Sequence, residues 1–182
     1  MNDTQLPRYE VFVQERDGGP YLHAGGVHAA DGELALLNAR DVFARRPECR
    51  GLWIAPADLF TCRTTEQLGG DPPLAFPSGT LEAEVYLVFA KIGYKGTHAY
   101  LGAVRAADPA EALQQSVMTL GGEEVTSWWV VPERARLSNR PDESAPWFGP
   151  ALDKPFRDQA FYPVETFMRE LKRSRDPKDA SG

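Results

Sequence analysis

The sequence is poor in the residues from which metal and disulfide sites are built. Its 182 residues include only two cysteines and three histidines. Two cysteines are too few for the disulfide framework of a small secreted domain. Cys49 and Cys62 also lie too far apart, with no histidine at ligand spacing, for a structural zinc site. The N-terminus does not resemble a signal peptide, so we expect free thiols in a cytoplasmic protein.

Positive charge and long apolar runs are scarce as well. Twenty Lys and Arg residues face 26 Asp and Glu residues, and the net charge is -6 with a pI near 5.1. This balance argues against nucleic acid as the main partner, because phosphate binding draws on clustered positive charge. The longest apolar run, residues 85–90, is far shorter than the roughly 20 residues of a membrane helix. We expect no membrane span and a protein or small-molecule partner.

Familiar catalytic signatures are missing too. The chain has no GxGxxG, Walker A, GxSxG or HExxH motif. It also has no Glu-x-x-His pair of the kind that di-iron sites use. His23 and His28, in HAGGVHAAD, are expected on opposite faces of a strand unless the glycine pair forms a bulge. We therefore expect solvated or hydrogen-bonded histidines and no metal-ligating or catalytic residue.

What the chain does contain is an internal repeat. YEVFV from Tyr9 matches YLVFA from Tyr86, and the Gly-x-Val-x-Ala-Ala-Asp pattern ending at Asp31 recurs ending at Asp108, both at an offset of 77. WIAP from Trp53 matches WVVP from Trp129 at an offset of 76. The sequence therefore predicts two diverged copies of one unit, over residues 9–60 and 84–137.

Each copy is expected to fold as strand, strand, helix, strand. Asp31 and Asp108 suit the N-cap of the helix, Pro109 its first position and Glu111 a capping box. Two apolar stripes at helical spacing should pack on the sheet: Ala35, Leu36, Ala39, Val42, Phe43 in the first copy, and Ala112, Leu113, Ser116, Val117, Leu120 in the second. The predicted class is α+β, an antiparallel sheet with helices packed on one face.

The remaining segments complete the predicted organisation. Residues 1–60 form the first unit, 61–83 a Gly/Pro-rich linker over the surface, 84–137 the second unit and 138–182 an aromatic tail. The tail ends in a short amphipathic helix around residues 164–171 and a charged, disordered terminus. Leu34, Leu37 and Ala44 fall on the far side of the first helix. They pack against the other copy or the linker, or they dock another subunit.

The first copy resembles a known family. YEVFVQ, HAGGVHAAD, the helix ELALLNARDVFARR and the strand GLWIAPADL come in the order found in the B subunit of multicomponent phenylacetyl-CoA epoxidases, the PaaB family. DKPFRDQAFYPV, residues 153–164, is similar to the C-terminal tail of that family. Members usually hold one such unit, whereas this chain holds two.

The resemblance implies an accessory role in aerobic phenylacetate degradation. In that family a di-iron subunit epoxidises phenylacetyl-CoA, a related helical subunit supports it, and a reductase with flavin and an iron-sulfur cluster delivers electrons. The B subunit bridges catalytic pairs and has no catalytic residue to carry over. The resemblance thus implies that this chain holds no cofactor and is not itself an enzyme.

Two other function classes stay open from the sequence: a stand-alone small-molecule-binding α+β enzyme, and an RNA-binding domain that stacks bases on Trp53, Trp128 and Trp129. If the bridging interpretation holds, a few buried aromatic and apolar side chains should carry the binding energy. The candidate interface residues are Leu34, Leu37, Trp147, Phe148, Phe156, Phe161, Tyr162, Phe167, Met168 and Leu171. The alternative for the tail residues is that they cover this protein's own sheet.

Overall fold

The computed structural model describes residues 6–44, 49–70, 82–122 and 124–139, together with 148, 167–169 and 171. The first unit contains β1 (Arg8–Gln14), β2 (Leu22–His28), α1 (Gly32–Phe43), β3 (Gly51–Pro56) and the short helix η1 (Ala57–Leu59). The second contains β5 (Glu84–Ile92), β6 (Ala99–Ala106), α3 (Pro109–Leu120), β7 (Val125–Pro132) and η2 (Glu133–Ala135). The predicted α+β class and the two-copy organisation are confirmed.

Both long helices begin where their capping residues predict. The Asp31 side chain accepts a hydrogen bond from the backbone N–H of Leu34, and Asp108 accepts one from Glu111. In α3 the Glu111 carboxylate also accepts from the N–H of Ala107. Because these bonds satisfy amides that have no partner inside a helix, the two helices start at equivalent positions and span 12 residues each.

The repeat extends further than the sequence indicates. Residues 61–70, predicted as the first part of the linker, form β4 (Thr61–Thr64) and helix α2 (Thr65–Gly70). The counterpart of β4, at the same offset of 76, is β8 (Leu137–Ser138). The threonine-rich TCRT segment suits an edge strand, and the turn residues begin only at Gly69. The structural linker therefore starts later than predicted.

The two units exchange these last strands. The antiparallel sheet has the order β4-β7-β5-β6-β2-β1-β3-β8. Thus β4, which follows the first unit, pairs with β7 of the second, and β8, which follows the second unit, pairs with β3 of the first. Each unit completes its sheet with a strand that follows the other unit in the sequence.

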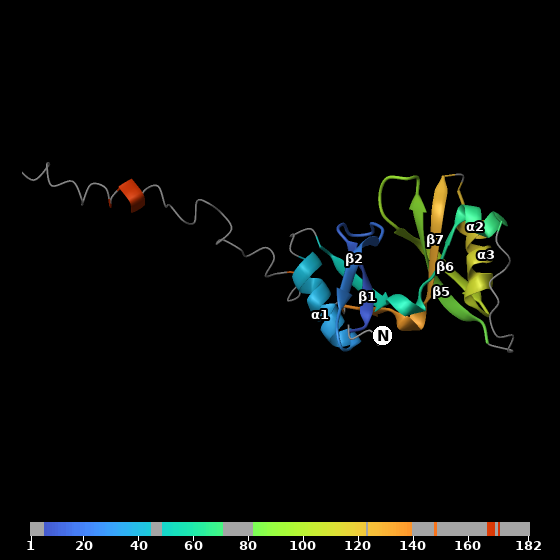
Figure 1. Cartoon of the computed structure of the whole chain (residues 1–182), viewed down its shortest axis with the longest axis horizontal. Coiled ribbons are helices and arrows are strands. Elements are labelled where there is room, and N and C mark those ends of the chain that lie inside the picture. Colours follow the sequence, from blue (N-terminus) through green and yellow to red (C-terminus); the bar gives the residue numbers. More distant parts are fainter. Residues whose placement is uncertain are drawn as a thin grey trace, which may run out of the picture.

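The sheet halves face each other, with the helices outside (Figure 1). Two core clusters lie between a helix and its half of the sheet, one around Val11, Ala35 and Ile54 and the other around Val88, Leu113 and Trp128. A third cluster, containing Phe12 and Phe89, joins the inner faces of the two halves. Both helices thus cover the same, outer face of the sheet, as predicted.

A few helix positions differ from the helical projection. Val42 and Val117 are predicted on the apolar stripes, but both are exposed near the ends of their helices. Ala44 is predicted on the far side, but it is buried, because α1 ends at Phe43 and residue 44 no longer follows the helical angle. None of the helices in the described part of the chain is long and apolar enough to span a membrane.

Candidate functional site

The inner faces of the sheet meet in a cluster of rings, here called the aromatic core. Its centre is the contact between Phe12 and Phe89, whose ring centroids lie 4.0 Å apart. These residues are equivalent in the repeat, 77 positions apart. The other rings surround this pair: Tyr21, His23, Trp53, Phe60, His98, Tyr100 and Trp129.

The aromatic core is close to two-fold symmetric. Tyr21 stacks on Trp53 with centroids 3.7 Å apart, and the equivalent pair His98 and Trp129 stacks at 3.8 Å. Between the units, Tyr100 meets Trp53 edge-on at 5.1 Å, and its counterpart His23 meets Trp129 at 5.0 Å. Backbone bonds repeat the symmetry, because His23 N–H donates to the carbonyl of His98 and Tyr100 N–H to that of Tyr21. The two units are therefore packed as a pseudo-dimer.

A β-bulge decides where the histidines point. The β1–β2 register shifts between Val11 and Phe12, so that Ala24 is the extra residue. The two histidines therefore do not lie on opposite faces: the bulge considered as the exception is present, and its extra residue brings His23 and His28 to the same face. His28 Nδ1 hydrogen-bonds the carbonyl of Leu6, and no group of three or more metal-ligating side chains lies together within the described residues.

His23 instead belongs to a polar trio in the inner face of the first unit. Its Nε2 donates to a carboxylate oxygen of the buried Glu10 at 2.7 Å, and Arg8 pairs with the other oxygen at 2.9 Å. Burial raises the pKa of Glu10, but the hydrogen bond from His23 and the charge of Arg8 outweigh it, so the pKa lies below its usual value. The second unit has Val85, Leu87 and Tyr100 at these three positions.

His98 is the residue of the aromatic core whose protonation depends most on burial. Burial, followed by the charges of His23 and Lys91, lowers the pKa of His98 from 6.5 to about 4. The unfolded chain therefore binds this proton more readily than the folded chain. Its contribution to stability is complete above pH 6.5 and is lost as the pH falls towards 4. The pKa of Glu10 is lowered from its usual value of 4.5, so the folded protein loses further stability as the pH falls below that value.

We therefore expect the free energy of unfolding to fall between pH 6.5 and pH 4. The variant His98→Tyr, which copies the Tyr21–Trp53 stack of the first unit, should show a shallower fall over this range. Denaturant unfolding at a series of pH values measures both slopes. Equal slopes for the two proteins would show that His98 is not the titrating group.

Cys49 and Cys62 are free thiols, as predicted. Cys49 is buried, and burial raises the pKa of its thiol to about 11, which keeps it protonated. A protonated thiol is a poor nucleophile and a poor metal ligand. Cys49 thus acts as a small apolar core residue of the first unit.

Two predicted interface residues lie on the outer surface of α1. Leu34 and Leu37 are 42% and 41% exposed, so neither is covered by the other unit. Ala44, predicted on the same side, is buried instead. The two leucines thus remain candidates for docking, and residues 71–81 of the linker, the other predicted cover, lie outside the described residues.

The tail residues are only partly within the described structure. Phe148 is 7% exposed and packs into the core of the first unit, as the own-sheet alternative describes. Phe167, Met168 and Leu171 are exposed, and residues 167–169 and 171 are helical, within the predicted amphipathic segment. The other predicted tail residues lie outside the described residues: Trp147, Phe156, Phe161 and Tyr162.

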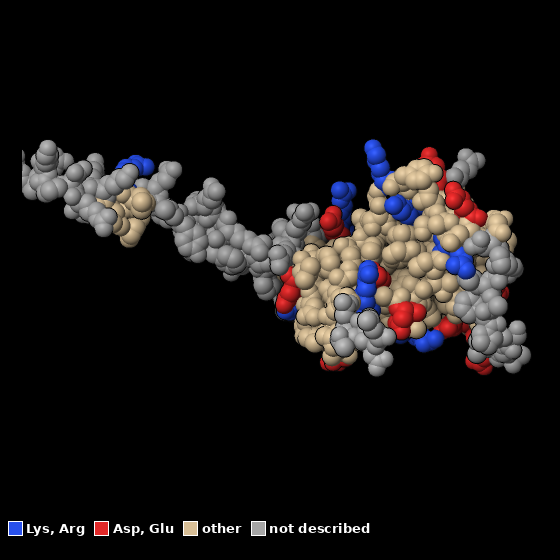
Figure 2. Space-filling view, in the orientation of Figure 1, with Lys and Arg blue, Asp and Glu red and all other residues tan. Residues whose placement is uncertain are grey.

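The tryptophans considered for base stacking are in contact with other side chains. Trp128 is buried under α3, and Trp129 stacks on His98. Trp53 lies between Tyr21 and the guanidinium of Arg136, which is 4.6 Å from the ring centroid. On the face shown in Figure 2, positive and negative side chains are interspersed around a broad uncharged area. Within the described residues, the contacts of these three tryptophans thus do not leave an open row of rings for stacking bases.

Both units of the chain are similar in sequence to one known protein family. The model of the family described as phenylacetic acid degradation B, PaaB, matches residues 5–71 and 82–168. The chain belongs to the PaaB family. Each matched segment contains one structural unit, which confirms a tandem duplication. The first match extends through β4 and α2, and the second continues past β8 to residue 168.

A curated relative within the PaaB family is the B subunit of 1,2-phenylacetyl-CoA epoxidase from Escherichia coli K12. It is 39% identical over 69 residues, which are 38% of this chain and 73% of the relative. An alignment of that length spans one of the two units. No solved structure matches the chain.

Sequence reasoning missed the aromatic core. The alternation in residues 9–14 places Phe12 opposite Tyr9, Val11 and Val13, which indicates two different environments. An apolar side chain on the second face also has to be buried by another element, because its exposure to water is unfavourable. The repeat itself was the available signal, because Phe89 occupies the same position in the second unit.

Proposed function

We propose that this chain is a non-catalytic accessory subunit of a multicomponent phenylacetyl-CoA epoxidase. The observation that carries the proposal is the PaaB match over both units, together with a relative whose name makes it one subunit of such an enzyme. In this proposal the chain is cytoplasmic and holds no cofactor. Its partners are the di-iron catalytic subunit and the related helical subunit, while the flavin and iron-sulfur cluster belong to the reductase.

The outer faces of the two helices support a docking role for the first unit. Leu34 and Leu37 of α1 have Glu111 and Gln114 as counterparts in α3. The same position is thus apolar on one helix and polar on the other, although both helices cover equivalent sheets. Since the fold alone demands no leucine there, we assign these two side chains to a partner interface.

The pseudo-dimer also bears on copy number. We propose that one chain takes the place of two single-unit subunits, because its two units already pack through equivalent residues. Native mass spectrometry of the complex purified from the native cell tests the copy number, and an activity assay of the purified chain tests the accessory role. One copy of this chain per two catalytic subunits is the expected result. Two copies would contradict the replacement, and turnover of phenylacetyl-CoA by the purified chain alone would contradict the accessory role.

The docking surface on α1 has its own test. Leu37→Asp should weaken binding to the other subunits about tenfold or more, because a charge then replaces an apolar anchor at the interface. Leu34→Asp should behave alike. The matched control is Gln114→Asp at the equivalent position of α3, which should change affinity less than about threefold. Pull-down titrations measure these affinities, and thermal unfolding checks that each variant is folded. Equal losses of affinity in L37D and Q114D would contradict a docking surface on α1.

A further inference from the structure

Two hairpin tips lie beside the junction of the two units. The first tip, residues 14–20, joins β1 to β2, and the second tip, residues 91–97, joins β5 to β6. Strands β2 and β6 are neighbours in the sheet, and the Thr97 hydroxyl donates to the carbonyl of His23 at 2.8 Å. Figure 1 shows both tips at the end of the molecule opposite the N-terminus. Because the repeat offset of 77 holds on both sides of them, the tips can be compared position by position.

The two tips carry charge of opposite sign. The first tip exposes two acids and one base, Glu15, Asp17 and Arg16. The second tip carries Lys91 and Lys95 and has no acidic residue. Within the described residues, none of these five side chains forms an ion pair. The charges of one tip are therefore available to meet the opposite charges of another molecule.

The second tip also exposes apolar side chains that the fold does not require. Ile92 is 52% exposed and Tyr94 is 91% exposed, whereas their counterparts in the first tip are Glu15 and Asp17. The hairpin thus forms equally well with acidic residues at both positions. Leu22, where the first tip meets β2, adds a leucine that is 36% exposed. A single exposed apolar residue is ordinary, but several at one end of a molecule indicate an interaction surface.

Hydrogen bonds to the start of β7 hold the second tip in place. The N–H of Gly93 donates to the carbonyl of Glu124 at 2.8 Å. The Thr126 hydroxyl donates to the carbonyls of Lys91 and Gly93, at 3.2 Å and 3.0 Å. A surface that is already ordered in the free protein loses less conformational entropy on binding. Tyr94 is thus presented on a fixed loop.

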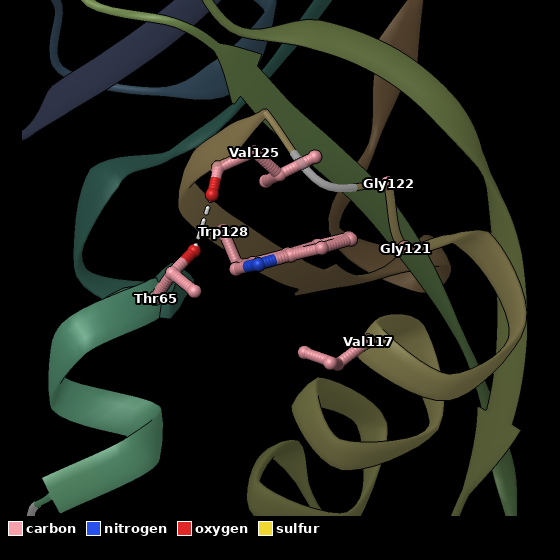
Figure 3. A pocket seen from close by; sticks show the side chains of 6 residues that line it. All are labelled: Thr65, Val117, Gly121, Gly122, Val125 and Trp128. Atoms are coloured by element: carbon pink, nitrogen blue, oxygen red, sulfur yellow. Dashed lines mark hydrogen bonds between the residues drawn. The ribbon is translucent and has the colours of Figure 1, made fainter.

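A pocket of about 400 Å³ at the end of α3 is the other apolar feature of the second unit to be compared (Figure 3). Its lining residues are Thr65, Val117, Gly121, Gly122, Val125 and Trp128. None of them is charged, and the buried indole N–H of Trp128 has no partner among the described residues. An uncharged pocket cannot select for an acidic chain or fix its orientation. The two tips can do both, because they carry both signs of charge.

We propose that the two tips form a self-complementary surface that binds a second copy of this chain. A two-fold axis that runs between the tips sets the first tip of one copy against the second tip of the other, so every contact occurs twice. Asp17 then faces Lys95 of the other copy, and Tyr94 packs near Leu22 of the other copy. The alternative orientation, with like tips together, would oppose equal charges.

This inference concerns the chain alone and does not rest on the proposed function. It is compatible with one chain per two catalytic subunits, because a pair of chains would then carry four. Failure of the inference would leave the accessory role untouched.

Sedimentation velocity of the isolated full chain tests the inference. A species of twice the 20.2 kDa chain mass should form below about 0.1 mM chain. Tyr94→Asp, which copies the first tip, should weaken association about tenfold or more, and the control Leu6→Asp should change it less than about threefold. Leu6 is 51% exposed near the N-terminus, at the opposite end of the molecule. Circular dichroism checks that each variant is folded. A chain that stays monomeric, or equal losses in the two variants, overturns the inference.

A charge exchange tests the orientation. Asp17→Lys and Lys95→Glu should each weaken association about fivefold or more, since the two-fold axis repeats the altered contact. The double variant D17K/K95E should return to within about threefold of the wild type, because opposite charges face each other again. Added salt should weaken the wild-type pair, because these charges are exposed. A double variant that associates no better than the weaker single variant overturns the inference. So does a monomeric chain in which Tyr94→Asp reduces binding to the other epoxidase subunits, because the tip then belongs to a different partner.

Discussion

Replacing Phe12 by alanine should lower the free energy of unfolding by about 3–5 kcal/mol, the usual cost of removing a buried phenylalanine. Phe12 and Phe89 are 0% and 1% exposed, and they meet across the two units. Truncating either ring leaves a cavity that neighbouring strands, fixed by their hydrogen bonds, cannot close. Phe89→Ala should therefore cost about as much.

Denaturant unfolding measures these losses, with Phe167→Ala as the control, because Phe167 is exposed. In the double variant the two losses should not add, since each ring contacts the other; aromatic pairs contribute about 0.5–1.5 kcal/mol beyond their burial. A loss below about 1 kcal/mol for Phe12→Ala would contradict the central place of this pair in the structure.

Producing the two halves as separate chains, residues 1–76 and 77–182, should give a complex when they are made together. Alone, neither half should unfold cooperatively. The first half would lack β8 and leave the Phe12 face of its sheet in water, and the second would lack β4. An exposed apolar sheet face and an unpaired strand edge favour aggregation over a folded monomer.

Co-purification and circular dichroism of each half, alone and mixed, test this expectation. Ending the second half at residue 136 removes β8 together with Phe148 of the first core and should weaken the complex, whereas ending it at residue 171 keeps both and should not. A cooperative transition for the first half alone, at the midpoint of the intact chain, would show that the exchanged strands are dispensable.

Much of the outer architecture was predictable because its signals are local. The caps at Asp31 and Asp108 are set by bonds to residues three positions away, and the helices follow from them. Because the two units are copies, a strand or helix predicted in one unit is also predicted at the equivalent residues of the other. The helical projection alone placed Leu34 and Leu37 on the side of α1 that faces away from the sheet, where both are exposed.

The inner architecture depends on contacts between residues far apart in the sequence. A strand of two residues, such as β8, has too few positions for a periodic pattern, so its pairing with β3 could not be read. The bulge at Ala24 moves His23 by a single position, and only the neighbouring Gly25, with φ of 140°, hints at it. The unpartnered indole of Trp128 depends on the whole environment and has no sequence signal.

The polar trio of Arg8, Glu10 and His23 shows what joining two copies in one polypeptide permits. In an assembly of identical chains, a substitution at a symmetric interface appears on both sides of the axis. A buried carboxylate would then face its own copy, and two like charges in one core repel each other. Here Leu87 stands where the second glutamate would be. Gene fusion thus lets one half acquire a charge while the other half stays apolar, so that the halves can evolve towards different partners.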